Sequence, residues 1–293
     1  MSSPHANPHE TPSLQIMKRG EAIRMAVLDA RRQEKRVGLV TTMGALHAAH
    51  LSLIDTSVEE CDMTVATVFV NPTQFDDADD LAHYPRDLEA DAAKLAERGC
   101  DLVFAPAASE MYRAEHETYV EVGPVARAFD GERRPGHFRG VATIVLKLFH
   151  LVPADRAYFG QKDYQQTLVV RRMVADFNLP IEIAVCPTVR EPDGLAMSSR
   201  NLRLSADERR RALSLSQSLS LASEMVAAGE RDADAVLRCM RAHIEAVGGV
   251  DIEYVGIVKD GTVTPVQQID GPVVALVAAC VGKTRLIDNR WIE

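Results

Sequence analysis

The sequence predicts an α/β fold, with a Rossmann-like parallel sheet in an N-terminal domain and a smaller α+β domain at the C-terminus. Short β-rich runs alternate with helical patterns as far as about residue 186. This order is typical of a parallel sheet with helices on both faces. After about residue 205 the order changes to two helices followed by three strands. The length of 293 residues also suits two domains.

Hydrophobic periodicity predicts the N-terminal elements. The run MTVATVFV at 63–70 is continuous and β-branched, as in a strand that is buried on both faces. A helix is expected over 85–99, because Pro85 stands near its start and Gly99 at its end. The other expected strands are 37–42, 102–105, 157–159 and 181–185, and the other expected helices are 51–60, 141–152 and 164–177. Ligands of such sheets bind at the carboxyl ends of the strands.

The C-terminal elements begin with a long helix over 205–229. Ser205, with Glu208 three residues later, forms a capping-box pattern at its start. A second helix is expected over 232–247, and strands are expected over 251–258, 273–281 and 285–288. We expect the boundary near Thr188, which gives domains 1–188 and 189–293. Residues 1–12 are polar, lack the apolar segment of a signal peptide, and are expected to be a disordered tail.

Composition and charge exclude several classes of protein. The net charge of -9 argues against nonspecific nucleic-acid binding, which needs a basic face. No apolar run is long enough to span a membrane. The five cysteines are scattered, without a C-x-x-C pair, as expected of reduced thiols in a cytoplasmic protein. An acidic protein that binds an anionic substrate must concentrate its cations locally.

The most informative segment is TTMGALHAAH at 41–50, between an expected strand and an expected helix. His47 and His50 share one helix face, so both can reach one anion. The N–H groups of the glycine turn and the positive end of the helix dipole are expected to point at the same place. One alternative is an exposed histidine beside a helix-capping one. A zinc site is less favoured, because there is no H-E-x-x-H pattern and no third ligand nearby.

Gln74 lies in the segment VNPTQF, which leaves the end of the expected strand at 63–70. Its amide could both donate to and accept from a hydroxy acid. The alternative is a plain turn, because Asn-Pro commonly opens turns. The acidic run at 76–80 is expected to be a solvated mobile loop, with metal binding as the less favoured alternative.

The segment FGQKDYQQ at 159–166 also lies between a strand end and a helix start. Gly160 allows the backbone to approach a ligand closely. Lys162 places a cation at a phosphate-binding position, and Asp163 could cap the helix or hold ribose hydroxyls or Mg²⁺. A plain capped helix is the alternative.

The loop just after the expected boundary contains Ser198, Ser199 and Arg200. Two hydroxyls and a guanidinium are all donors to phosphate oxygens. A polar linker without function is the alternative.

These segments, in this order, resemble the HIGH and KMSKS pair of the nucleotidyltransferase superfamily. The motifs TMGALHxxH, VFVNPTQF, RPGHFxGV, FGxKDYQQ, TVRExDGLAMSSRN and a late VKDG resemble the pantoate–β-alanine ligase family. The resemblance covers about residues 16–292. It implies an enzyme that joins pantoate to β-alanine through a pantoyl adenylate, releasing pyrophosphate and AMP. It also implies ATP with Mg²⁺ as substrate, no tightly bound cofactor, and a homodimer.

The same resemblance implies roles for individual residues. His50, His47 and Lys162 are expected to be catalytic, with His50 as proton donor toward the leaving pyrophosphate. Gln74 and Gln166 are the implied pantoate ligands, and Gln74 also serves β-alanine. The implied ATP contacts are Met43, Gly44, Ala45, Leu46, His47, Ala48, Ala49, His50, Gly160, Gln161, Lys162, Asp163, Val189, Met197, Ser198, Ser199 and Arg200. No protein ligands to a metal are implied.

Two positions depart from the family pattern. Ala49 replaces the glycine of H-x-G-H, so that a methyl group could crowd the nucleotide, and Gln161 replaces a commoner glutamate. Two other functions are open to the sequence. A nucleotidyltransferase that stops at the adenylyl product would not be expected to carry VNPTQF and KDYQQ. A non-catalytic nucleotide-binding homologue would be expected to have lost the histidines, the lysine or the S-S-R loop.

Overall fold

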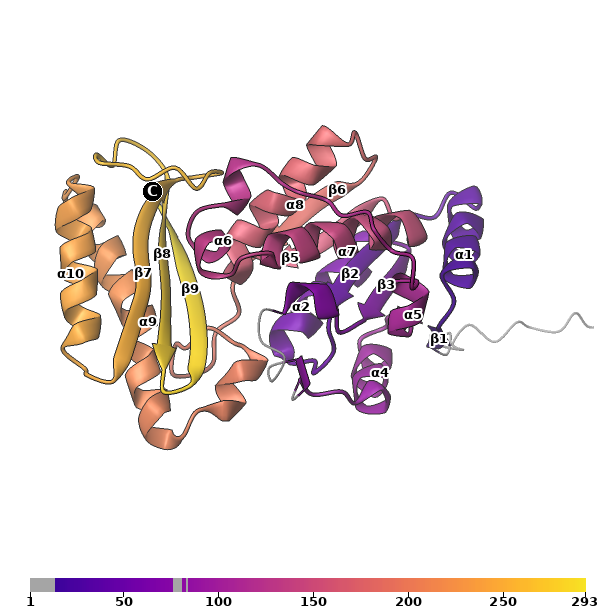
Figure 1. The fold of residues 1–293 in the computed structure, drawn as a ribbon, viewed down its shortest axis with the longest axis horizontal. Helices are drawn as coiled ribbons and strands as arrows, with labels where there is room; N and C mark the ends of the chain where they lie inside the picture. The colour runs from indigo at the N-terminus through magenta and orange to yellow at the C-terminus, as the bar shows by residue number, and fades with distance from the viewer. Residues whose placement is uncertain (1–13, 76–80, 83) are drawn as a thin grey trace, which may run out of the picture.

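The computed structural model describes residues 14–75, 81–82 and 84–293 and contains two sheets (Figure 1). The expected fold class is confirmed. One sheet is parallel and has helices on both faces. The other is a small antiparallel sheet, and two helices pack against one of its faces. The predicted tail at 1–12 and the predicted mobile loop at 76–80 lie outside the described residues.

The parallel sheet has the strand order β1-β4-β3-β2-β5-β6. Its strands are β1 (Gln15–Met17), β2 (Val37–Thr42), β3 (Met63–Val68), β4 (Leu102–Phe104), β5 (Arg156–Gly160) and β6 (Glu182–Cys186). From β2 the chain moves outward through β3 to β4, and later returns to place β5 on the other side of β2. The order therefore reverses between β2 and β5. In doubly wound sheets this is where the ligand crevice opens.

Helices cover both faces of this sheet. On one face lie α1 (Gly20–Arg32), α7 (His137–Leu151) and α8 (Tyr164–Asp176), and on the other lie α2 (Ala48–Glu60) and α4 (Leu88–Glu97). The short helices α5 (Ala108–Met111) and α6 (Asp130–Arg133) belong to connections. Neither β1 nor α1 was expected from the sequence. Pro85 lies ahead of α4 rather than inside it, because the Asp87 carboxylate accepts the N–H of Ala90 and caps the helix.

The C-terminal half packs α9 (Ala206–Ala227) and α10 (Ala233–Glu245) against β7 (Val250–Lys259), β8 (Val273–Val281) and β9 (Thr284–Ile292). The predicted capping box at Ser205 and Glu208 is confirmed, with bonds in both directions. The strand expected at 285–288 is too short. The strand β9 continues to Ile292, and the polar residues after Asp288 hide this continuation from periodicity. Their side chains have partners elsewhere in the fold, as Arg290 has in Ser220. The boundary near Thr188 stays a prediction.

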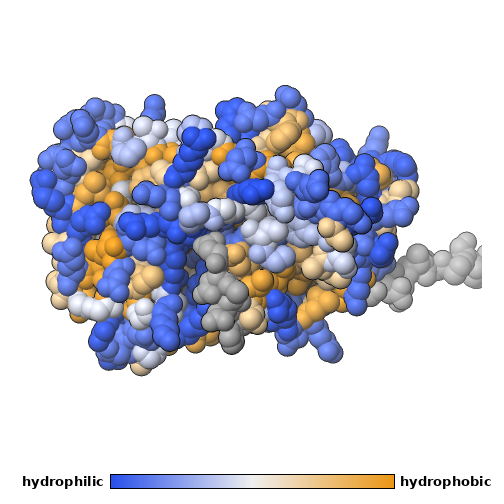
Figure 2. Space-filling model, viewed as in Figure 1, coloured by the Kyte–Doolittle hydropathy of each residue, from blue (hydrophilic) through white to orange (hydrophobic). Residues whose placement is uncertain are grey.

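The two halves meet through an apolar seam. Tyr164 and Leu168 of α8 pack with Val258, Val274 and Leu276 of the antiparallel sheet. On the outside, a band of hydrophilic residues follows this seam (Figure 2). In the part of the chain that the structure describes, no helix combines the length and apolarity needed to cross a bilayer.

Candidate active site

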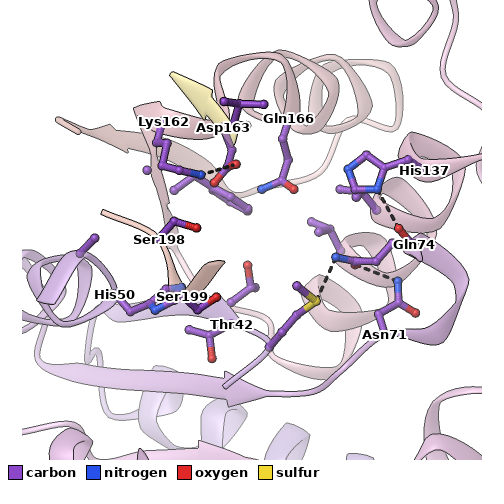
Figure 3. A pocket seen from close by; sticks show the side chains of 18 of the residues that line it. Thr42, His50, Asn71, Gln74, His137, Lys162, Asp163, Gln166, Ser198 and Ser199 are labelled. Atoms are coloured by element: carbon purple, nitrogen blue, oxygen red, sulfur yellow. Dashed lines mark hydrogen bonds and ion pairs between the residues drawn. The ribbon is translucent and has the colours of Figure 1, made fainter. Parts of the chain in front are cut away.

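Most of the predicted site residues line one cavity at the carboxyl ends of the parallel strands (Figure 3). The segments after β2 and after β5 both reach it, because these neighbouring strands flank the reversal of strand order. The predicted residues in its lining are Met43, His47, Ala49, His50, Gln74, Gly160, Lys162, Asp163, Gln166, Met197, Ser198, Ser199 and Arg200. The described lining does not include Gly44, Ala45, Leu46, Ala48, Gln161 or Val189.

The cavity has two chemically different sides (Figure 3). The histidine–lysine side consists of His47, His50, Lys162, Ser198, Ser199 and Arg200. The amide side consists of Asn71, Gln74, Arg134 and His137. Gln166 points into the space between them, and its amide has no hydrogen-bond partner among the described residues.

The two imidazoles of the histidine–lysine side are stacked, with ring centroids 4.1 Å apart. His47 is the N-cap of α2, and its backbone N–H donates to His50 Nδ1 (3.4 Å). Burial, and to a smaller extent the neighbouring His47, lowers the pKa of His50 to about 3. Burial and then Lys162 lower the pKa of His47 to about 4. Both rings are therefore uncharged at neutral pH, and His50 carries its proton on Nε2, because its Nδ1 accepts.

The turn before α2 is fixed by a buried carboxylate. Gly44 and Ala45 both adopt left-handed backbone conformations, with φ of 86° and 53°. The N–H groups of Ala45 and Leu46 donate to Asp91 of α4, each over 2.8 Å. Lys94, one turn further along α4, donates to the Leu46 carbonyl (2.8 Å). The expectation that the N–H groups of the turn point at a bound phosphate is therefore wrong at Ala45 and Leu46, whose N–H groups are taken by Asp91.

Lys162 and Asp163 lie in a single 3-10 turn between β5 and α8. Lys162 Nζ is 3.4 Å from Asp163 Oδ1. Partly exposed pairs of this kind contribute about 0–1 kcal/mol, so Lys162 can turn to a phosphate at small cost. Burial opposes ionisation of Asp163, but Lys162 and Arg200 outweigh it and hold the pKa of Asp163 below its ordinary value. The Asp163 side chain makes no capping bond to α8 in the described structure, so that alternative is wrong.

The serine–arginine loop comes from beyond β6 and is folded against the start of α2. The Ala49 N–H donates to Met197 Sδ (3.3 Å) across the cavity mouth. Ser198 Oγ accepts the N–H of Arg200 (3.3 Å) and shapes the turn that follows. The loop is therefore an ordered wall of the cavity rather than a linker.

Gln74 is the centre of the amide side. Its Oε1 accepts from Asn71 Nδ2 (3.0 Å), and its Nε2 donates to Met43 Sδ (3.1 Å). Its backbone carbonyl accepts from His137 Nδ1 (2.9 Å) and Arg134 Nη2 (3.2 Å). Because His137 Nδ1 donates, His137 Nε2 is an acceptor, and Arg134 Nη1 lies 3.1 Å from it. Gln74 is thus held through both its side chain and its backbone.

Asn71, Arg134 and His137 were not among the predicted site residues. Signals for all three were present, because Asn71 precedes a proline at a strand end and the others belong to the RPGHF motif at 134–138. Their role was missed because it is indirect. Each contacts Gln74, and only the fold brings 134–138 to the end of β3.

Comparison with known sequences agrees with the motifs. The model of the family described as pantoate-beta-alanine ligase matches residues 15–291. A protein named pantothenate synthetase 1, from Bradyrhizobium diazoefficiens, is 50% identical over 94% of this chain and 97% of its own length. The pantothenate synthetase of Moorella thermoacetica is also 50% identical, over 96% of this chain and 99% of its own length.

Comparison with solved structures gives the same result. A crystal structure of pantothenate synthetase from Thermus thermophilus is similar with a TM-score of 0.89 and 43% identity, over 94% of this chain and 98% of that one. A pantoate-beta-alanine ligase from Francisella tularensis, complexed with beta-gamma ATP and beta-alanine, has a TM-score of 0.77 and 30% identity, over 94% and 97%. The resemblance found in the motifs is confirmed, and the chain belongs to the pantoate–β-alanine ligase family.

Proposed function

We propose that this chain condenses pantoate with β-alanine to give pantothenate, with ATP as the second substrate of the first step. One observation carries the proposal beyond family membership. A single cavity joins a set of phosphate donors on the histidine–lysine side to a fixed glutamine on the amide side. A nucleotidyltransferase that stops at the adenylyl product would not be expected to carry the VNPTQF and KDYQQ segments or to match this family, so it is not favoured.

In the first step, a carboxylate oxygen of pantoate attacks the α-phosphorus of ATP. The bond from that phosphorus to the β-phosphate oxygen breaks, and pyrophosphate leaves a pantoyl adenylate. The protein's task is positioning and charge stabilisation. We assign Gln74 and Gln166 to pantoate, and Lys162 with His47 and His50 to the phosphates.

The uncharged state of the histidines fits this assignment. His50 can donate from Nε2 to a phosphate oxygen without first carrying a charge. Bound phosphates would raise the pKa of both imidazoles, because an opposite charge favours the protonated form. His50 could then pass a proton to the leaving pyrophosphate, as the family resemblance implies.

In the second step, the uncharged amine of β-alanine attacks the acyl carbon of the adenylate. The new amide bond forms, the bond to the AMP oxygen breaks, and the amine loses a proton. We assign Gln74 to this substrate as well, because it borders the pantoate position and is already fixed.

The remaining assignments concern ATP and its metal. We keep the predicted ATP contacts, and those outside the cavity lining, such as Ala45 and Leu46, act by shaping the segments that line it. We expect Mg²⁺ to arrive with ATP, because it is usually held by phosphates, waters and one or two carboxylates. Among the described residues no group of three His, Cys, Asp or Glu side chains is arranged to bind a metal alone. Asp163, which lines the cavity together with Asp130, is the carboxylate that we assign to the ribose or the ion.

Two properties follow from the family and the composition. We propose a homodimer, which light scattering after gel filtration would test. We also propose a cytoplasmic location, because all five cysteines are free thiols, as is usual in a reducing compartment.

A single-turnover experiment tests the proposed function. Enzyme in excess is mixed with ATP, Mg²⁺ and pantoate, and β-alanine is omitted. We expect a stoichiometric burst of pyrophosphate, followed by AMP and pantothenate only after β-alanine is added. Pyrophosphate that forms only once β-alanine is present would contradict the two-step route. Absence of product with all three substrates would contradict the function itself.

A further inference from the structure

One buried amide of the antiparallel sheet reaches across to the lysine of the cavity. Asn289 lies on β9 and is 3% exposed. Its Nδ2 donates to the backbone carbonyls of Gln161 (2.9 Å) and Lys162 (2.8 Å). A single side chain of the C-terminal half therefore holds two successive carbonyls of the turn that presents Lys162.

Asn289 is itself firmly placed. Its backbone N–H donates to the carboxylate of the buried Asp288 (2.7 Å). That carboxylate receives two bonds from Arg190 (2.7 and 3.0 Å), and Arg190 also donates to the Asn289 carbonyl (3.4 Å). Bidentate arginine–carboxylate pairs fix geometry as well as charge. The backbone of Asn289, from which its amide extends, is thus held in one position by these hydrogen bonds.

Packing alone does not explain an asparagine at this position. Asn289 Oδ1 is buried and has no hydrogen-bond partner in the described structure. A buried acceptor without a partner destabilises the folded state. The useful part of the side chain is therefore the NH₂ group, and both of its bonds go to the turn before α8.

The turn has few other means of holding Lys162. Among the described residues, the space beside Gly160 is open to 4 Å, and the ion pair of the Lys162 side chain is the 3.4 Å contact with Asp163. A lysine is a point charge on a flexible stem, so the place of its backbone decides what its ammonium group can reach. We propose that Asn289 is a positioning residue through which the antiparallel sheet holds Lys162 against the phosphates of the substrate. This rests on the proposed function of the cavity.

A double-mutant cycle tests the proposal. Asn289→Asp keeps the shape of the side chain but removes both donors, and it is combined with Lys162→Ala. The rate of pyrophosphate formation is measured in single turnovers without β-alanine. If Asn289 acts through Lys162, Asn289→Asp slows this step about 10- to 100-fold in the wild-type background, because small misplacements of a catalytic group are costly. It then has little further effect when Lys162 is already alanine.

Controls separate positioning from loss of structure. Arg290→Met changes the next residue on β9. The guanidinium of Arg290 donates to Ser220 Oγ on α9 (3.1 Å) rather than to the turn that carries Lys162. We expect it to change the rate by less than about threefold. Asn289→Ala carries the same cycle if the aspartate variant fails to fold. Equal losses in both Lys162 backgrounds, or no loss at all, would overturn the proposal. A wild-type enzyme without a pyrophosphate burst would instead count against the proposed function.

Discussion

The two sides of the cavity are built in different ways. On the amide side, Gln74 accepts hydrogen bonds from Asn71, His137 and Arg134 and donates one to Met43 Sδ, all within the N-terminal half. On the histidine–lysine side, the groups come from three separate segments, and one of them lies beyond β6. On that side, Met197 Sδ accepts a hydrogen bond from the Ala49 N–H. The ammonium group of Lys162 lies 3.4 Å from Asp163 Oδ1.

This difference matches what each side is proposed to bind. Pantoate is a small hydroxy acid, and an amide held in one orientation can select it before any chemistry occurs. The phosphates change charge and position during the reaction, so uncharged imidazoles and a loosely paired lysine can follow them. The Gln74 side chain is thus fixed before pantoate binds, whereas the Lys162 ammonium group can still move toward the reacting phosphates.

The largest effect is expected from His50→Ala. Removing one donor at a reacting phosphate typically lowers the rate about 10²- to 10³-fold. The pyrophosphate burst should slow by that amount, while pantoate binding, measured by calorimetry, stays close to normal. His150→Ala, an exposed histidine at the end of α7, is the control. Near-normal turnover of His50→Ala would remove His50 from the mechanism.

A substitution on the amide side should change the KM for pantoate rather than the rate of the chemical step. Asn71 is 1% exposed, and its Nδ2 donates to Gln74 Oε1 and to the Gly140 carbonyl (3.2 Å). Asn71→Asp removes both donors, and leaving buried groups unpaired costs about 1–3 kcal/mol. We expect the KM for pantoate to rise about tenfold and the KM for ATP to stay unchanged. Equal increases for both substrates would show that the two sides are not independent.

The histidine pair should leave a signature in the pH dependence of stability. The pKa of His50 is about 3 in the folded protein, against 6.5 as its ordinary value. The unfolded chain therefore binds this proton first on acidification. The stability that uncharged His50 contributes is fully present above about pH 6.5, and it is lost as the pH falls from there toward 3.

This signature is measurable as a difference between variants. Urea unfolding at neutral pH and at about pH 5 should show a smaller loss of stability for His50→Gln than for the wild type. His150→Gln should follow the wild type, since that side chain is exposed. If His50→Gln loses as much stability as the wild type, the imidazole is not held uncharged.

The smallest effect is expected from Ala49→Gly. Ala49 lines the cavity, and removal of its methyl group should tighten binding of an ATP analogue a few-fold, while the N–H that donates to Met197 is retained. Ala90→Gly is a matched control, because Ala90 is exposed in the first turn of α4, lies outside the cavity lining and bears the same helix penalty of up to about 1 kcal/mol. Weaker binding by Ala49→Gly would show that the methyl group makes a useful contact.

The fold class and the segments that line the cavity could be predicted from the sequence alone. Hydrophobic periods and caps such as Ser205 with Glu208 are local, so they can be recognised without knowing the partners. The histidine and lysine segments each follow a strand of the parallel sheet, so their convergence could be predicted from parallel pairing, whereas only the family resemblance joined the serine–arginine loop to them. Short or polar elements such as β1 and the second half of β9 escaped, because their pairing depends on distant residues.

How these groups are held depends on contacts that form only in the folded molecule. Asp91 lies 46 residues from Ala45 and takes the N–H that was expected to face a bound phosphate. His137 is 63 residues from the Gln74 carbonyl that it holds, and Asn289 is 127 residues from Lys162. No periodicity or local motif encodes such pairs, because each hydrogen bond exists only after the sheets have formed and closed on each other.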